Sequence, residues 1–87
     1  MKLSSNQQLY EYLFFLISEL KNAGDDMLAQ TVAIAAAQAS STSTEFLGES
    51  RIALRQVLSQ ENGVLTQEGR EDLMSVIDQI SQALDHR

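Results

Sequence analysis

The fold is decided most clearly by residues 68–85, EGREDLMSVIDQISQALD, in which apolar residues return every three or four positions. Projected at about 100° per residue, one side of this stretch holds Leu73, Val76, Ile77, Ile80, Ala83 and Leu84. The other side holds the acidic and polar residues Glu68, Glu71, Asp72, Ser75, Asp78, Gln82 and Asp85. The pattern therefore predicts a helix that packs on one face and is anionic on the other.

Residues that favour helix ends mark three more helices upstream of this one. The chain contains no proline, so the ends are set by capping side chains and by glycine. A Ser, Thr or Asp side chain before a helix accepts a hydrogen bond from an otherwise unpaired backbone N–H group. The expected helices are residues 6–22 capped by Ser4 or Ser5 and ended by Gly24, 27–39 capped by Asp25 or Asp26, 43–61 capped by Thr42, and 67–85 capped by Thr66. We therefore predict an all-α fold, a compact bundle of about four helices that are mostly antiparallel and joined by short loops.

Length and composition indicate one ordinary globular domain over residues 1–87. A chain of 87 residues has room for one core, and it buries roughly 60% of the surface that its unfolded form exposes. Hydrophobic residues make up 44% and charged residues 21%, so the chain has enough apolar surface to fold. It contains no cysteine, which excludes disulfides and thiolate chemistry and favours a cytoplasmic location. The apolar stretch from Leu13 to Ile17 lies between Glu11 and Glu19, so we expect neither a membrane span nor a signal peptide.

The charge balance points to a basic partner. Twelve acidic residues stand against six basic ones, which gives a formal net charge of −6. We expect no direct binding to DNA or RNA, because a polyanion is repelled at long range. The acids on the outer side of the last helix are candidates for docking a basic protein: Glu68, Glu71, Asp72, Asp78 and Asp85. The alternative is that they form a solvated surface that keeps the protein soluble.

Two large apolar residues do not fit the packing faces of their helices. In the first helix the apolar arc includes Phe14, whereas Phe15 projects to the polar side between Glu11 and Glu19. In the third helix Ile52 projects away from the apolar arc. Phe15 and Ile52 are therefore candidates for partner contact, and they form one site if they are neighbours in space. The alternative is that they are single exposed apolar residues, which are common on protein surfaces.

The second helix, residues 27–39, contains no charged residue. A helix that is apolar all round is usually covered all round, by neighbouring helices, by a second copy or by a partner. Val32, Ala35, Ala36 and Ala39 are therefore candidates for an oligomer interface, and a homodimer is one expected form. The alternative is that alanine, a small residue that favours helix, is simply exposed.

Residues suited to catalysis or metal binding are sparse. The single histidine, His86, is the penultimate residue, and no Asp or Glu stands three or four positions before it. The four glycines are dispersed and form no phosphate-binding loop. No serine has the strand-turn-helix setting of an activated nucleophile. We therefore expect no catalytic residue, no metal site and no cofactor, and a protein that is not an enzyme.

Two functional hypotheses follow. The first is an immunity protein or antitoxin, a small acidic domain whose anionic helical face covers the basic site of a toxin such as a nuclease. This hypothesis is based on size and charge, not on a motif. The second is a structural or scaffolding protein that forms a homo-oligomer or docks on a larger complex through apolar area. The two differ in whether binding weakens as the salt concentration rises.

Overall fold

The computed structural model describes residues 2–85, which form four α-helices and one short 3₁₀ turn. The α-helices are α1 (Asn6–Asn22), α2 (Asp26–Ala36), α3 (Ser43–Gln60) and α4 (Gln67–Asp85), and the 3₁₀ turn η1 (Ala37–Ser40) lies between α2 and α3. No strand occurs within residues 2–85. The radius of gyration, 12.0 Å, matches the value of about 12 Å for a compact chain of this length. The prediction of a compact all-α bundle of about four helices is confirmed.

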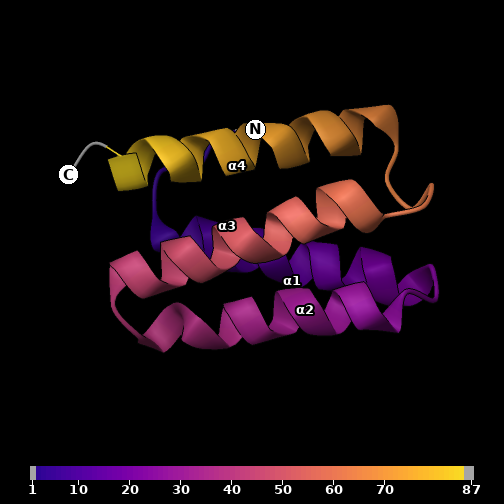
Figure 1. The fold of residues 1–87 in the computed structure, drawn as a ribbon, viewed down its shortest axis with the longest axis horizontal. Coiled ribbons are helices and arrows are strands. Elements are labelled where there is room, and N and C mark those ends of the chain that lie inside the picture. The colour runs from indigo at the N-terminus through magenta and orange to yellow at the C-terminus, as the bar shows by residue number, and fades with distance from the viewer. Residues whose placement is uncertain (1, 86–87) are drawn as a thin grey trace.

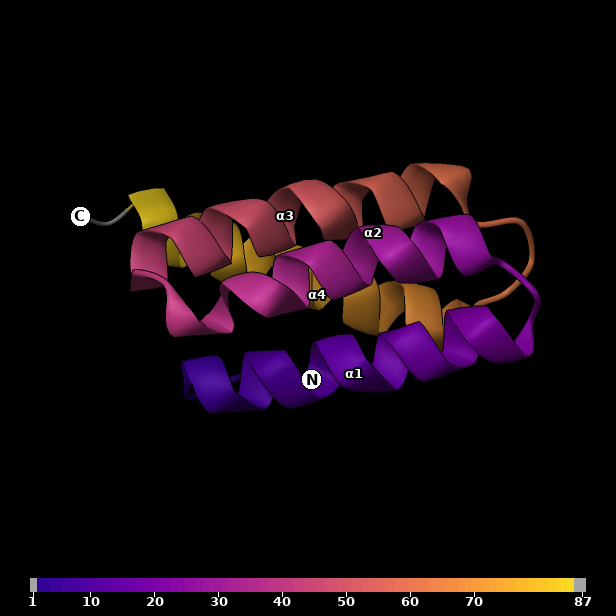
Figure 2. The same ribbon diagram turned by 90° about the horizontal axis from the view of Figure 1, so that it is seen from below.

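Each helix of the bundle packs on the next one in the sequence (Figure 1, Figure 2). Successive helices run in opposite directions along the long axis, and their connections lie alternately at the two ends (Figure 1). The backbones of α1 and α4 lie further apart than those of consecutive helices. The seam between α1 and α4 is therefore closed mainly by side chains.

Capping side chains begin each α-helix at the positions that the sequence predicts. The four bonds run from Gln8 N to Ser5 Oγ (3.2 Å), from Leu28 N to Asp25 Oδ1 (3.2 Å), from Glu45 N to Thr42 Oγ1 (3.2 Å) and from Gly69 N to Thr66 Oγ1 (3.0 Å). Each bond satisfies one backbone N–H group that the first helical turn leaves unpaired. After α1, Gly24 takes a φ of +82°, the left-handed conformation that favours glycine.

The second helix is shorter than the sequence predicts. Its α-helical part ends at Ala36 rather than at residue 39, and residues 37–40 wind more tightly as η1. Ser41 N donates a hydrogen bond to Gln38 O at 2.9 Å, the bond between residues three apart that marks this winding. Such a last turn pairs carbonyl groups that the end of an α-helix leaves open, and it redirects the chain toward α3.

The core is formed by one apolar face of each helix. α1 contributes the stripe Leu9, Leu13, Leu16 and Leu20, each of which is at most 1% exposed. The other helices contribute the equally buried residues Val32, Phe46, Leu54, Val57, Leu73 and Val76. Phe14 was expected to pack in the core with the apolar arc of the first helix, but it lies at the surface. The arc predicted from the sequence is wider than the face of α1 that the bundle covers. Its side chain is 49% exposed and packs edge-on against Tyr10, with the ring centroids 4.8 Å apart.

Ser50 of α3 is a polar residue that the core encloses completely, with 0% of its surface exposed. Its hydroxyl oxygen has no hydrogen-bond partner within residues 2–85. Burying an unpaired hydroxyl costs about 1–3 kcal/mol in mutational data. Ser50 therefore lowers the stability of the bundle, and the sequence pattern gave no sign of it.

Replacing Ser50 with alanine is expected to stabilise the protein. Ser50→Ala removes the unpaired hydroxyl and keeps a side chain of similar size, so the free energy of unfolding should rise by about 1 kcal/mol. Urea unfolding followed by circular dichroism measures this change. A less stable Ser50→Ala variant would contradict the burial of an unpaired hydroxyl at this position.

Glu61 fixes the connector between α3 and α4. α3 ends at Gln60, one residue before the prediction, since Glu61 has an extended backbone with a ψ of 143°. The Glu61 side chain is only 3% exposed. One of its carboxylate oxygens accepts from Val64 N at 3.0 Å and from Leu65 N at 3.2 Å, and the other pairs with the Arg70 guanidinium. These bonds hold the connector against the start of α4.

The same bonds determine the pKa of Glu61. Burial acts to raise the pKa of this carboxyl, but hydrogen bonds from Leu65, Arg70 and Val64 and the charge of Arg70 outweigh it and lower the pKa below its ordinary value of 4.5. A carboxyl whose pKa is lower in the folded chain contributes stability above the unfolded pKa, and the contribution is lost as the pH falls through the folded pKa. Glu61 therefore stabilises the fold at neutral pH and ceases to do so in acid.

Glu61→Gln should unfold more easily at pH 7 and should lose less stability than the parent between about pH 5 and pH 3. The reason is that the amide replaces one acceptor oxygen with N–H donors and carries no charge to titrate. Urea unfolding at a series of pH values measures both effects. Glu49→Gln, at an exposed position of α3, serves as the matched control. If the free energy of unfolding of Glu61→Gln depends on pH in the same way as that of the parent, the carboxylate does not stabilise the connector.

Candidate protein-binding surface

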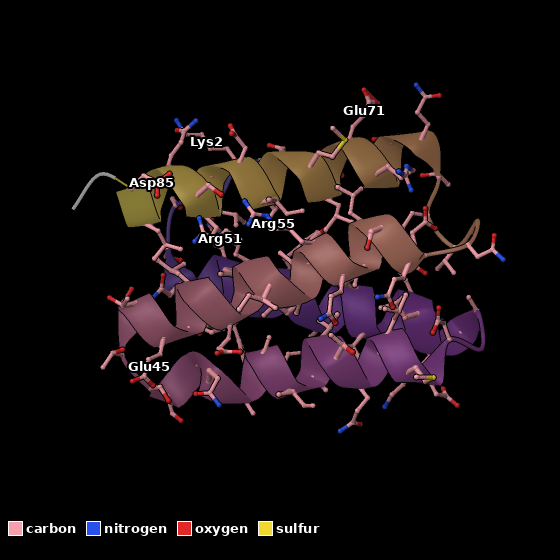
Figure 3. All side chains as sticks on the ribbon, in the orientation of Figure 1. Lys2, Glu45, Arg51, Arg55, Glu71 and Asp85 are labelled. Atoms are coloured by element: carbon pink, nitrogen blue, oxygen red, sulfur yellow. The ribbon has the colours of Figure 1, made fainter. Side chains whose placement is uncertain are left out.

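The acidic residues of α4 divide into two groups. Glu71, Asp78 and Asp85 are exposed on the outer side of the helix, and Figure 3 shows Glu71 pointing away from the bundle. Glu68 and Asp72 lie on the side that faces α1, where both line a groove. The five candidate residues thus share one helix but lie on two of its sides.

Basic side chains lie near the other flank of α4. Arg51 and Arg55 point from α3 toward α4 (Figure 3), and Arg51 Nη1 donates to Ser81 Oγ at 3.4 Å. Arg70, on α4 itself, pairs with Glu61. The Arg51 and Arg55 guanidinium groups therefore partly neutralise the α3 flank of α4, whereas the charge of Arg70 is balanced by Glu61.

A groove, here called the α1–α4 groove, runs along the seam between α1 and α4. Two adjoining hollows form it and share Tyr12, Phe15 and Asp72. Its apolar base includes Tyr12, Leu16, Val64 and Leu65, and its margins carry the acids Glu11, Glu19, Glu68 and Asp72. Lys2 is the basic residue among those that line it, at one end. Carboxylates therefore dominate the charge of the groove.

Phe15 and Tyr12 form the aromatic part of the groove. Phe15 is 57% exposed and Tyr12 only 6%, and their ring centroids lie 6.5 Å apart. Burial, and then the Asp72 carboxylate, raise the pKa of Tyr12 above its ordinary range. The groove thus combines an exposed ring, a neutral hydroxyl at its base and carboxylates at its margins.

Ile52 lies on a different face of the bundle from Phe15. It lines a shallow hollow between α2 and α3 together with Ile34, and the two side chains are 54% and 56% exposed. Phe15 lines the α1–α4 groove instead. Phe15 and Ile52 therefore do not form one contact site.

The candidate oligomer interface on the second helix is largely internal. Val32, Ala35 and Ala36 are 0%, 2% and 4% exposed, because α2 packs between α1 and α3. Of the four candidates, Ala39 is exposed, and it lies in η1. Val32 and Ala36 are therefore covered by the bundle itself, and Ala35 is reached only through the hollow between α2 and α3 that it lines. Their lack of charge is explained by burial within one molecule.

The described part of the chain shows neither a membrane-spanning helix nor a metal-binding cluster. Within residues 2–85, no helix has both the length and the apolar character needed to cross a membrane. In the same range, no cluster of three or more acidic or histidine side chains is arranged to hold a metal ion. His86 lies outside the described residues, so the expectation about it concerns the sequence alone.

Comparison with known proteins adds no relative. No protein-family model, curated protein or solved structure matches the chain.

Helical spacing predicts which groove residues are neighbours on α1, but not that residues of α4 lie across from them. Glu11 and Glu19 stand four residues before and after Phe15, so helical spacing places them beside it. Tyr12 belongs to the packing arc by periodicity, and it lines a groove because α4 approaches α1 through side chains. No local signal indicates that Glu68 lies across the seam from Phe15.

Proposed function

We propose that this chain is a small protein-binding domain that docks its acidic surface on a basic protein. The observation that supports this proposal is the gathering of carboxylates on α4 and on the adjoining side of α1. α4 carries its five acids outside the core, and Glu11 and Glu19 of α1 border the same seam. An anionic surface of this kind attracts a basic protein at long range and raises its association rate.

We further propose that the partner is a toxin such as a nuclease, which this chain neutralises in the manner of an immunity protein or antitoxin. An enzyme that acts on nucleic acid needs a basic site for phosphate groups, and such a site complements the acidic surface. The bundle measures 36 × 24 × 19 Å, so its broad face is large enough for the roughly 800 Å² that each partner buries in a standard interface.

The experiment begins with capture of the partner on the immobilised chain at low salt, from the cells that produce it. The captured protein is purified, and its association with variants is followed by surface plasmon resonance. The Asp78→Lys/Asp85→Lys variant should associate about tenfold more slowly at low salt. The difference should shrink as salt rises, because counter-ions screen exposed charges beyond about 10 Å at 0.1 M salt.

The matched control is the Glu45→Lys/Glu49→Lys variant, which changes the net charge equally but on α3. It should associate faster than the α4 variant. Equal slowing in both variants would assign the effect to net charge rather than to α4. Capture of an acidic protein, or binding that does not respond to salt, would contradict the proposal. A captured nuclease that remains fully active in the complex would contradict the neutralising role.

A second candidate function is self-association or scaffolding through the face formed by α2 and α3. The observation that favours it is the exposed pair Ile34 and Ile52, which border one hollow. We expect a homodimer at micromolar concentration that Ile52→Glu converts to a monomer, because the new carboxylate would be buried without a partner. Sedimentation velocity measures both states. A parent chain that sediments as a monomer would exclude this candidate.

A further inference from the structure

We infer that the α1–α4 groove receives a basic amphipathic helix of the partner protein. Its Lys or Arg side chains reach the carboxylates at the margins, and its apolar side chains rest on Phe15 and the base of the groove. This inference depends on the proposed function and deepens it, since it names the part of the acidic surface that binds and the kind of segment that it binds.

The spacing of residues along the groove suits a helix. On α1, Glu11, Phe15 and Glu19 stand four residues apart, so consecutive side chains lie about 6 Å apart along the axis. On α4, Glu68 and Asp72 have the same separation. A third helix laid along the seam presents its own side chains with this repeat, so positions four apart meet successive groups on both margins. From Glu11 to Glu19 the groove covers about 12 Å, or roughly two turns of such a helix.

The apolar base supplies contact area that a purely electrostatic surface lacks. Phe15 presents an exposed ring, and Leu16, Val64 and Leu65 continue the apolar lining behind it. Docking of an amphipathic helix in a groove uses apolar anchors spaced three or four residues apart. An exposed aromatic ring also attracts the ammonium or guanidinium group of a neighbouring side chain.

Tyr12 adds a polar hydroxyl group to the lining of the groove. Tyr12 is only 6% exposed and lines both hollows. The phenol is protonated at neutral pH, as an ordinary tyrosine is, and burial and then the Asp72 carboxylate raise its pKa further. It is therefore a donor for an incoming acceptor and an acceptor for a guanidinium N–H.

The charge of the groove selects a basic occupant. Glu11, Glu19 and Glu68 are exposed at its margins, so an acidic segment is repelled. A purely apolar helix would cover these carboxylates without pairing them, which is costly. The hollow between α2 and α3 has one acid, Glu49, and no aromatic lining, so it lacks the features that recognise a cationic helix.

The test uses a synthetic probe, a helical peptide of about four turns with leucine along one face and lysine on its flanks. A second peptide has the same composition in an order that forms no apolar face. Isothermal titration calorimetry with the whole chain measures both affinities. The amphipathic peptide should bind about tenfold more tightly than the reordered one, because only its side chains match the repeat of the groove.

Two groove variants and two matched controls locate the binding site. Phe15→Ala and Glu68→Lys should each weaken binding of the amphipathic peptide by about tenfold, since each removes one group of the groove. Phe14→Ala and Glu71→Lys alter the same residue types on the same helices outside the groove, and they should change the affinity by less than about twofold. Thermal unfolding verifies that each variant remains folded.

Each outcome supports or overturns the inference. Equal affinity for the two peptides, no effect of Phe15→Ala, or equal effects of Glu68→Lys and Glu71→Lys would each overturn the groove as the binding site. The proposed function would then still be judged by the captured partner, whose experiment does not use the peptide. If the captured partner is acidic while peptide binding depends on Phe15 and Glu68, the proposed function fails and the groove remains a binding site for cationic helices.

Discussion

The leucine stripe of α1 is the interaction on which the rest of this structure depends. Leu9, Leu13, Leu16 and Leu20 are almost completely buried, and α2, α3 and α4 bring their own apolar faces to the same core. Burying one such side chain contributes about 2 kcal/mol, whereas a whole domain is stable by only about 5–15 kcal/mol. A bundle with one small core therefore cannot enclose many unpaired charges, and its carboxylates are forced outward.

Glu61 illustrates the condition under which a carboxylate can be buried here. Its side chain is nearly inaccessible, and two backbone N–H groups and the Arg70 guanidinium compensate for its loss of water. The acids of α4 with candidate binding roles lie at the surface instead, where a protein partner can reach them. Because α4 approaches α1 less closely than it approaches α3, part of this acidic surface becomes a groove with an apolar base. The same packing that buries the leucines thus determines where charge and aromatic surface meet.

The sequence predicted the features that depend on neighbouring residues. Caps such as Asp25 and Thr42 act on N–H groups three positions away, so they mark helix starts without knowledge of the fold. The predicted end of α2 was wrong by three residues. A 3₁₀ segment follows Ala36, and no proline or glycine in the sequence marks that change. Ser50 was missed for a related reason, since its burial depends on how α3 sits against its neighbours.

The candidate binding surface was likewise only partly predictable from the sequence. Phe15 was predicted because it lies on the polar side of its own helix, and the α4 acids were predicted because they project away from the packing face of that helix. Their juxtaposition depends on contacts between residues more than fifty positions apart, which helical periodicity does not report. The interpretation of Val32, Ala35 and Ala36 also needed the packed structure, since an alanine-rich helix looks the same in sequence whether its own bundle or a second chain covers it.

The central claim is that the acidic side formed by α1 and α4, with the groove between them, is the surface that binds a basic partner. Hydrogen–deuterium exchange of the chain, alone and saturated with the amphipathic lysine–leucine peptide, tests this most directly, because exchange slows where backbone is covered or made more stable. The account predicts slower exchange in α1 around Phe15 and in residues 64–72, with little change in α2 and the adjoining part of α3. Slower exchange centred on Ile34 and Ile52, with none around Phe15, would contradict it.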